Sequence, residues 1–167
     1  PGGQCVLEAR KAEREIYYTL EPGHGLRAGD RVAVVIDWAR RYRLMRLHFA
    51  AEIVLELAYR ELGYPEKVGA HIAEDKARID FLWDENIAPL FPGMLAIVKR
   101  IVEKDSSFLS AFSDKAAKLR HWEIPGFGRV SCGGTHLRRP GQIGEIILKR
   151  KNPGKGKERI EICLRVP

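Results

Sequence analysis

Apolar residues recur at three- and four-residue spacing through the middle of the chain and predict one long α-helix from about 38 to 62. A single stripe along that helix holds Leu44, Leu47, His48, Ala51, Leu55, Ala58 and Leu62. Asp37 is suited to cap the first turn, and Gly63 followed by Pro65 is typical of a helix end. The pattern places His48 on the buried face of the helix and Glu52, one turn later, at the edge of that face.

Shorter patterns predict the elements that follow this helix. Apolar, β-forming runs bounded by turn residues indicate strands at 68–72, 77–81, 126–131, 143–151 and 158–166. Helical spacing predicts a helix over 84–105, which Pro89 and Pro92 should break in its first half, and a shorter helix over 113–120. This order predicts an α+β fold, with the long helix and further helices packed on a mainly antiparallel sheet.

The first 36 residues have the composition of strands and turns. Residues 14–20 are rich in β-forming residues, 21–25 form a turn cluster, and 31–36 predict a buried strand. We therefore expect a small β-rich N-terminal subdomain over 1–36, truncated at its start, and a main domain over 37–167.

Composition adds a partner class and a compartment. The 29 Lys and Arg residues against 22 Asp and Glu leave a net charge of +7, which favours an anionic partner such as nucleic acid. Three cysteines (Cys5, Cys132 and Cys163) are too few for a secreted disulfide scaffold and indicate a reducing compartment. No apolar run approaches the roughly 20 residues that cross a membrane, and no signal pattern opens the chain. We therefore expect a cytoplasmic protein.

The segment from Cys132 to His136 is the strongest candidate for chemistry. A thiol and an imidazole lie four positions apart with Gly133 and Gly134 between them, so a tight turn could bring both to one metal ion. Zn²⁺ accepts Cys sulfur, His nitrogen and carboxylate oxygen. Two ligands rarely suffice, and His48 with Glu52, one helical turn apart, could complete the site. The sequence therefore predicts a zinc site with His48, Glu52, Cys132 and His136 as ligands.

These residues resemble the metal motifs of the editing domain that alanyl- and threonyl-tRNA synthetases share with freestanding AlaX-type proteins. Cys132-Gly133-Gly134-Thr135-His136 resembles the second metal motif of that family. Further matches follow in order along the chain: Pro1 to Gln4, Gly29 to Asp37, Arg41 to His48, Ala77 to Phe81, Gln142 to Ile146, and Gly154 to Ile160. The resemblance covers nearly the whole chain and supports the same α+β fold.

The resemblance also implies an activity. The family hydrolyses the ester of a wrongly charged tRNA, and its alanine-type members act on serine or glycine attached to tRNA(Ala). Its zinc is held by two histidines of the first motif and by the Cys and His of the second. The resemblance therefore implies that His48, Cys132 and His136 are ligands in this chain. Gln4, in the remnant of the glycine-rich motif, is expected near the substrate as a catalytic residue.

The first metal motif departs from the family pattern. The family has His-Thr-Ala-Thr-His, whereas this chain has His48-Phe49-Ala50-Ala51-Glu52. Glu52 could replace the second histidine as a ligand, act as a general base on water, or be a solvated residue of a site that has lost its metal. Phe49 could pack in the core or line the pocket. Without the two threonine hydroxyls, recognition of a serine side chain is open.

Two groups of basic residues are the expected RNA contacts. Arg138 and Arg139 follow His136 directly, and a denser cluster falls on the closing strands and their turn: Lys149, Arg150, Lys151, Lys155, Lys157 and Arg159. Such charges would bind a phosphate backbone in a salt-dependent way. Together with the resemblance they make the acceptor stem of tRNA the expected partner.

The first functional hypothesis is thus a trans-acting, zinc-dependent deacylase of mischarged aminoacyl-tRNA. The departures at Phe49, Ala51 and Glu52 leave open a catalytically silent tRNA-binding protein that keeps the editing fold. A third hypothesis is a hydrolase of small esters unconnected with RNA.

Overall fold

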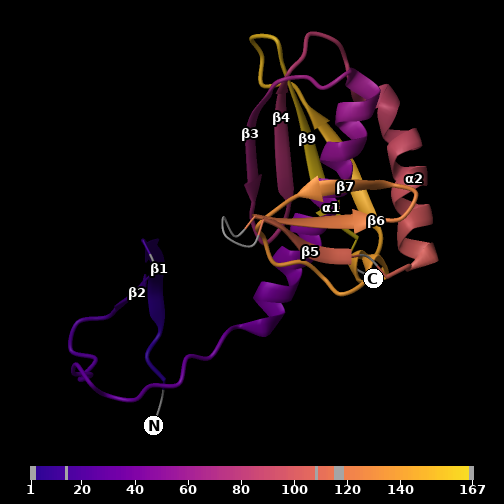
Figure 1. The fold of residues 1–167 in the computed structure, drawn as a ribbon. Coiled ribbons are helices and arrows are strands. Elements are labelled where there is room, and N and C mark those ends of the chain that lie inside the picture. Colours follow the sequence, from indigo (N-terminus) through magenta and orange to yellow (C-terminus); the bar gives the residue numbers. More distant parts are fainter. Residues whose placement is uncertain (1–2, 14, 108, 115–118, 166–167) are drawn as a thin grey trace. The chain divides into compact units, whose positions relative to one another are not determined.

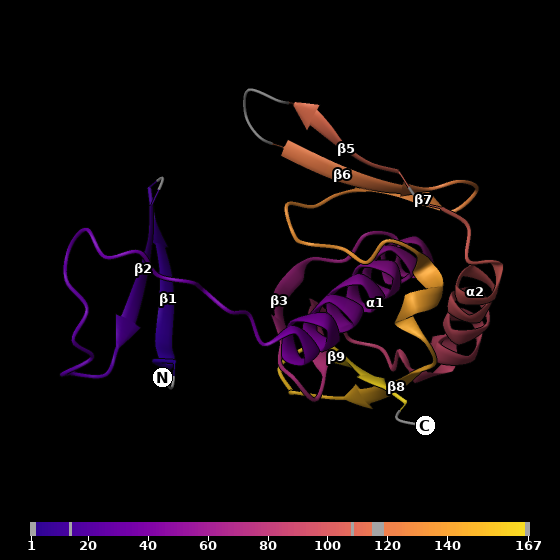
Figure 2. The ribbon, with the colours of Figure 1, turned by 90° about the horizontal axis from the view of Figure 1, so that it is seen from below.

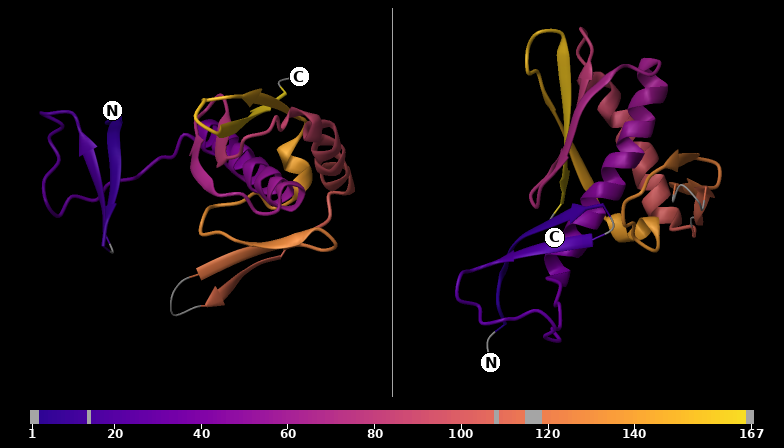
Figure 3. Two further views of the ribbon diagram at one scale, coloured as in Figure 1. Left: turned by 90° about the horizontal axis from the view of Figure 1, so that it is seen from above. Right: turned by 60° about the vertical axis from the view of Figure 1, so that its left-hand side comes forward.

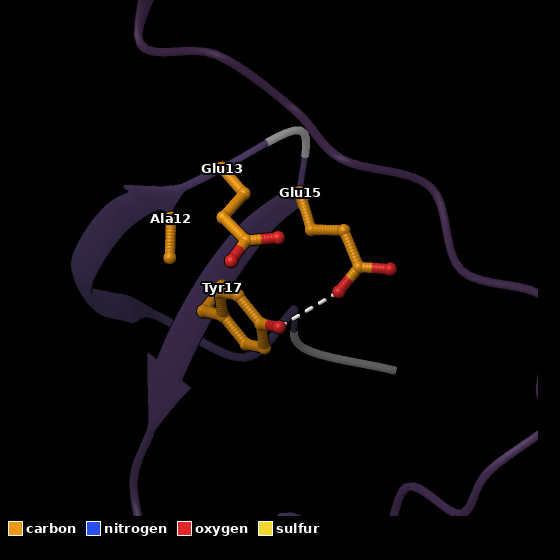
Figure 4. A pocket seen from close by; sticks show the side chains of 4 residues that line it. All are labelled: Ala12, Glu13, Glu15 and Tyr17. Atoms are coloured by element: carbon orange, nitrogen blue, oxygen red, sulfur yellow. Dashed lines mark hydrogen bonds between the residues drawn. The ribbon is translucent and has the colours of Figure 1, made fainter.

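A computed structural model describes residues 3–13, 15–107, 109–114 and 119–165. The chain divides into two compact units, Pro1–Val35 and Ile36–Pro167. In the first unit, strands β1 (Val6–Ala12) and β2 (Glu15–Leu20) pair antiparallel. A shallow hollow lies beside their connection, where the Tyr17 hydroxyl donates a hydrogen bond to Glu15 Oε2 over 2.7 Å (Figure 4). That bond raises the pKa of Tyr17, and we assign the hollow no function.

The prediction of a buried strand over residues 31–36 is wrong. These residues adopt no regular secondary structure, and Val35 is 89% exposed. The run is apolar and β-branched, but a strand also needs a neighbouring strand to accept its hydrogen bonds. Within the described residues of this unit, the sheet contains only β1 and β2.

The second unit places the long helix α1 (Trp38–Leu62) between two antiparallel sheets (Figures 1 and 2). The four-stranded sheet has the order β3 (Lys67–Ile72), β4 (Ala77–Leu82), β9 (Lys157–Leu164) and β8 (Ile146–Lys151). The three-stranded sheet has the order β5 (Leu109–Asp114), β6 (Leu119–Ile124) and β7 (Gly128–Ser131). Helix α2 (Phe91–Lys104) and two short 3-10 helices, η1 (Ala88–Leu90) and η2 (Pro140–Ile143), complete the unit. The predicted α+β fold is confirmed.

The ends of α1 follow from their local chemistry. The Asp37 carboxylate accepts a hydrogen bond from the Arg40 N–H over 3.0 Å, and Gly63 ends the helix with a left-handed φ of 68°. The predicted stripe is too narrow, however, because Phe49, Ile53 and Val54 are also fully buried. A helix with a sheet on each of two sides must be apolar over more than one stripe.

The helix predicted over 84–105 begins later, at Phe91. Pro89 lies in η1 and Pro92 in the first turn of α2, where a proline costs no hydrogen bond of the helix. The expected break in the first half therefore takes the form of a separate 3-10 turn. Among the described residues, no helix is long and apolar enough to span a membrane.

The prediction of a short helix over residues 113–120 is wrong. Residues 113–114 end β5 and residues 119–120 begin β6, while 115–118 lie outside the described residues. Alanine, lysine and leucine favour a helix locally, but eight residues are too few for a helix to be stable alone. Pairing of β6 with both β5 and β7, which buries Trp122 completely, prevails over that local preference.

Candidate metal centre

The structure brings together four potential metal ligands from two distant segments. They are His48 and Glu52 of α1, and Cys132 and His136 of the loop after β7, and one ligand atom of each lies within 4.8 Å of the others. His48 Nε2 lies 3.3 Å from Cys132 Sγ and 3.3 Å from Glu52 Oε1. His136 Nε2 lies 2.9 Å from Glu52 Oε2.

The two 3.3 Å separations suit a single small cation, and the 2.9 Å contact of His136 with Glu52 is a hydrogen-bond distance. Ligand atoms around a tetrahedral zinc lie roughly 3.3–3.8 Å apart, as bonds of about 2.0–2.3 Å require. Two imidazoles, one thiol and one carboxylate are all ligand types that zinc accepts. The side chains are also partly withdrawn from water, with His136 5% and Glu52 13% exposed. The donor set and its geometry can therefore hold a metal ion.

The loop that carries Cys132 is held by both the backbone and the side chain of Arg120 of β6. The Cys132 N–H donates to the Arg120 carbonyl over 2.9 Å. The Arg120 guanidinium in turn donates to the carbonyls of Gly133 and Gly134 over 3.3 and 2.6 Å. The Gly134 N–H points back at Cys132 Sγ over 3.2 Å. Arg120 thus shapes the turn that aims the thiol, a role that the sequence pattern did not reveal.

The two glycines of the turn have different roles. A Cβ at Gly134 would lie 2.4 Å from His48 Nε2, whereas a Cβ at Gly133 would meet nothing within 4 Å. Only Gly134 therefore lets the turn approach the helix closely enough to bring Cys132 beside His48.

Gly134→Ala is expected to displace the His48 ring, to destabilise the protein by about 1–3 kcal/mol as an overpacked contact does, and to weaken metal binding. Gly133→Ala is the matched control and should leave both unchanged. Thermal unfolding and metal titration of the two variants measure the difference. Equal behaviour of the two variants would show that the close approach of Gly134 to His48 has no functional importance.

Glu52 is a positioned carboxylate rather than a solvated surface residue. Burial on its own would raise the pKa of Glu52, but hydrogen bonds with His136, His48 and Cys132 outweigh burial and lower it to about 2. Glu52 Oε2 also accepts a hydrogen bond from Trp122 Nε1 over 2.6 Å. The group is therefore ionised at neutral pH and held from several sides.

Cys132 is a thiol in the absence of metal. Burial raises its pKa to about 11, and its hydrogen bond to Glu52 adds to the rise against the opposing Gly134 N–H. A metal that binds here must displace the thiol proton, because the thiolate is the ligand form.

Phe49 packs in the core beside the centre. Its side chain is fully buried, with its ring perpendicular to that of Trp122 at 5.2 Å and 5.6 Å from that of His136. It therefore packs behind His136 of the centre and against Trp122, and its fully buried ring offers no surface to a pocket.

The basic residues predicted to bind RNA lie in two places. Arg138 and Arg139 are exposed at the start of η2, where Arg139 Nη1 lies 3.4 Å from Asp105 Oδ2. The other cluster lies on β8, β9 and their turn, and two of its members have buried partners. Arg159 donates to Asp80 over 2.6 and 3.0 Å, and Arg150 donates to Glu158 over 2.5 Å.

Four lysines make up the rest of that cluster. Within the described part of the chain, no salt bridge engages Lys149, Lys151, Lys155 or Lys157. Side chains alternate along a strand, and Ile79, Ile160 and Leu148 face the helices. The alternate positions therefore carry charge on the outer face of the four-stranded sheet: Arg78, Asp80, Lys149, Lys151, Lys157, Arg159 and Glu161.

This outer face lies on the other side of α1 from the three-stranded sheet (Figure 3). The candidate metal centre lies between α1 and that three-stranded sheet, so the hairpin lysines do not surround it. Among the described residues, the Cys132 loop is contacted by Arg120 and by Arg41, and Arg41 Nη2 donates to Thr135 Oγ1 over 2.6 Å. Gln4 is exposed in the N-terminal unit, and its catalytic role stays a prediction.

Known proteins show similarity along nearly the whole chain. No protein-family profile matches it. The alanyl-tRNA editing protein AlaX-M of Saccharolobus solfataricus is 34% identical over 93% of this chain and 73% of its own length. AlaX-M of Methanosarcina acetivorans is 33% identical over 97% of this chain and 80% of its own length. The alanine–tRNA ligase of Staphylothermus marinus is 33% identical over 93% of this chain but only 20% of its own length.

Proposed function

The chain belongs to the AlaX-M family of alanyl-tRNA editing proteins, and on this basis we propose that it hydrolyses the ester of tRNA(Ala) charged with the wrong amino acid, serine or glycine. The observation that carries the proposal is the convergence of His48, Glu52, Cys132 and His136 on one point. We place this activity in the cytoplasm, where aminoacyl-tRNA is made and used.

The metal of this site is proposed to be zinc, held by the same four residues. The thiol favours zinc over metals that prefer oxygen ligands alone. When bound, zinc acts as a Lewis acid that polarises an ester carbonyl or a water molecule. With both Glu52 and the Cys132 thiolate as anionic ligands, the set carries one more negative charge than a set of three histidines and one cysteine. We therefore expect weaker polarisation than in that arrangement.

The protein side chains supply orientation and charge around the metal. Arg120 keeps the Gly133 and Gly134 carbonyls turned toward itself, which leaves the Gly134 N–H directed at Cys132. Arg41 fixes the hydroxyl of Thr135. Thr135 is exposed and adjoins His136, so its hydroxyl is a candidate contact for the substrate in place of the two absent threonines.

Incubation of the purified protein with seryl-tRNA(Ala), glycyl-tRNA(Ala) and alanyl-tRNA(Ala) tests the proposal. We expect release of serine or glycine at a rate well above that without protein, and little release of alanine. The relative rates for serine and glycine show which amino acid the site selects. Intact mischarged tRNA in the presence of metal-loaded protein would overturn the deacylase proposal and favour a silent tRNA-binding protein.

The lysines on the outer face and turn of the β8–β9 hairpin are proposed to bind tRNA phosphates. Replacement of Lys149, Lys151 and Lys155 by alanine should weaken tRNA binding and reduce the slope of log affinity against log salt by about 2–3, or roughly one unit for each phosphate that is no longer neutralised. Turnover at saturating tRNA should change little, because these residues lie away from the metal centre. Binding assays at several salt concentrations measure the effect.

Lys99→Ala with Lys104→Ala on α2 provides the control of comparable charge change. If this pair lowers affinity and the salt slope as much as the hairpin substitutions do per charge removed, the hairpin is not a specific binding surface.

A further inference from the structure

Trp122 reaches the metal centre from the middle of a strand. It lies on β6, is fully buried, and stacks on Phe127 with the ring centroids 6.3 Å apart and the planes 3° apart. On another side its ring meets the Phe49 ring edge to face. The indole N–H can only donate, and a buried tryptophan needs an acceptor for it. That acceptor is Glu52 Oε2, at 2.6 Å.

This hydrogen bond makes the two oxygens of Glu52 different from each other. Oε2 accepts from Trp122 and faces His136 Nε2 at 2.9 Å, whereas Oε1 faces His48 Nε2 at 3.3 Å. The terminal torsion of a glutamate is broad and has no strongly preferred angle. The indole, which is fixed between two aromatic rings, can therefore determine how the carboxylate is turned.

We infer that Trp122 is a positioning residue for Glu52. The indole N–H of Trp122 holds Oε2, so that the carboxylate would present Oε1 to a bound metal. This inference rests on the metal centre of the proposed function. Residues that ligate metals are commonly oriented by a hydrogen bond from outside the site, and loss of that bond typically lowers metal affinity by about 10–100-fold.

Trp122→Phe tests the inference, since it removes the N–H and keeps an aromatic ring in the core. Co²⁺ is the probe, because it occupies zinc sites, its visible absorption reports binding, and its near-ultraviolet charge-transfer band reports thiolate coordination. We expect Trp122→Phe to bind Co²⁺ about 10–100-fold more weakly than the unaltered protein. Trp83→Phe is the control, because Trp83 is a partly buried tryptophan outside the centre. Its Co²⁺ affinity should equal that of the unaltered protein.

The same substitution in the Glu52→Ala background separates positioning from packing. If Trp122 acts through Glu52, adding Trp122→Phe to Glu52→Ala should lower Co²⁺ affinity no further. A packing role would lower it to a similar extent in both backgrounds, and that result would overturn the inference.

Two further outcomes distinguish the inference from the proposed function. Unchanged Co²⁺ affinity in Trp122→Phe would overturn the role of Trp122 and leave the metal centre and the deacylase proposal intact. An unaltered protein that binds neither Co²⁺ nor Zn²⁺ would overturn both. Thermal unfolding of each variant without metal confirms that it is folded.

Discussion

Replacement of Cys132 by alanine is expected to abolish metal binding and deacylation together. The thiol is the softest ligand of the set and lies 3.3 Å from His48 Nε2. Loss of an outer hydrogen bond to a ligand typically costs up to about 100-fold in affinity or activity, so loss of the ligand itself should cost more than about 100-fold. Elemental analysis of the purified variant and hydrolysis of mischarged tRNA(Ala) measure the two effects.

Cys163→Ala is the matched control for this prediction. Cys163 is also a partly buried free cysteine, but it lies on β9, in the four-stranded sheet. The Cys163→Ala variant should retain its metal and full activity. A Cys132→Ala protein that keeps its metal and its activity would refute the assignment of the thiol as a ligand.

Glu52 is expected to show the second largest effect, and its variants separate the roles that the sequence left open. If Glu52 is a ligand, Glu52→Ala should lose most of the metal, whereas Glu52→His should keep it, because an imidazole can occupy the same position. Glu52→His should also restore the stronger polarisation expected of three histidines and one cysteine. Metal content and single-turnover hydrolysis, measured on both variants, report these effects separately.

A different pattern would assign Glu52 another role. If both variants hold metal and both lose hydrolysis, Glu52 is a general base. If both keep metal and hydrolysis unchanged, neither role is correct. The buried, multiply hydrogen-bonded carboxylate with a pKa of about 2 favours the ligand outcome, because a general base works best with a pKa near the working pH.

Local signals explain which parts of the fold could be predicted. The bounds of α1 follow from Asp37 and Gly63, which act on their own turns and need no distant partner. The predictions for residues 31–36 and 113–120 were wrong because the structure of these segments depends on whether a neighbouring strand is present. Residues 31–36 have the composition of a strand but, among the described residues, no partner strand, whereas residues 119–120 have helix-forming neighbours but pair with β5 as the start of β6.

The candidate site shows the same division. His48, Glu52, Cys132 and His136 were found because their spacing and their order along the chain both point to a metal. Arg120 and Trp122 were missed because they come from β6, and β6 reaches the centre only through its pairing with β7. An alternating run such as Arg120-His121-Trp122-Glu123-Ile124 indicates a strand, but it does not indicate which buried acceptor the indole will meet.

The ligands come from two segments of the chain, and His48 and Cys132 are 84 positions apart. This separation links metal binding to the stability of the folded protein. An ion that binds only when both segments are in place acts as a cross-link between α1 and the loop after β7, and by mass action it adds RT ln(1 + [metal]/Kd) to the stability of the folded chain. At a free metal concentration of 100 times Kd this amounts to about 2.7 kcal/mol. Metal starvation would therefore remove the protein as well as its activity, because the chain without metal opens more often and is degraded sooner.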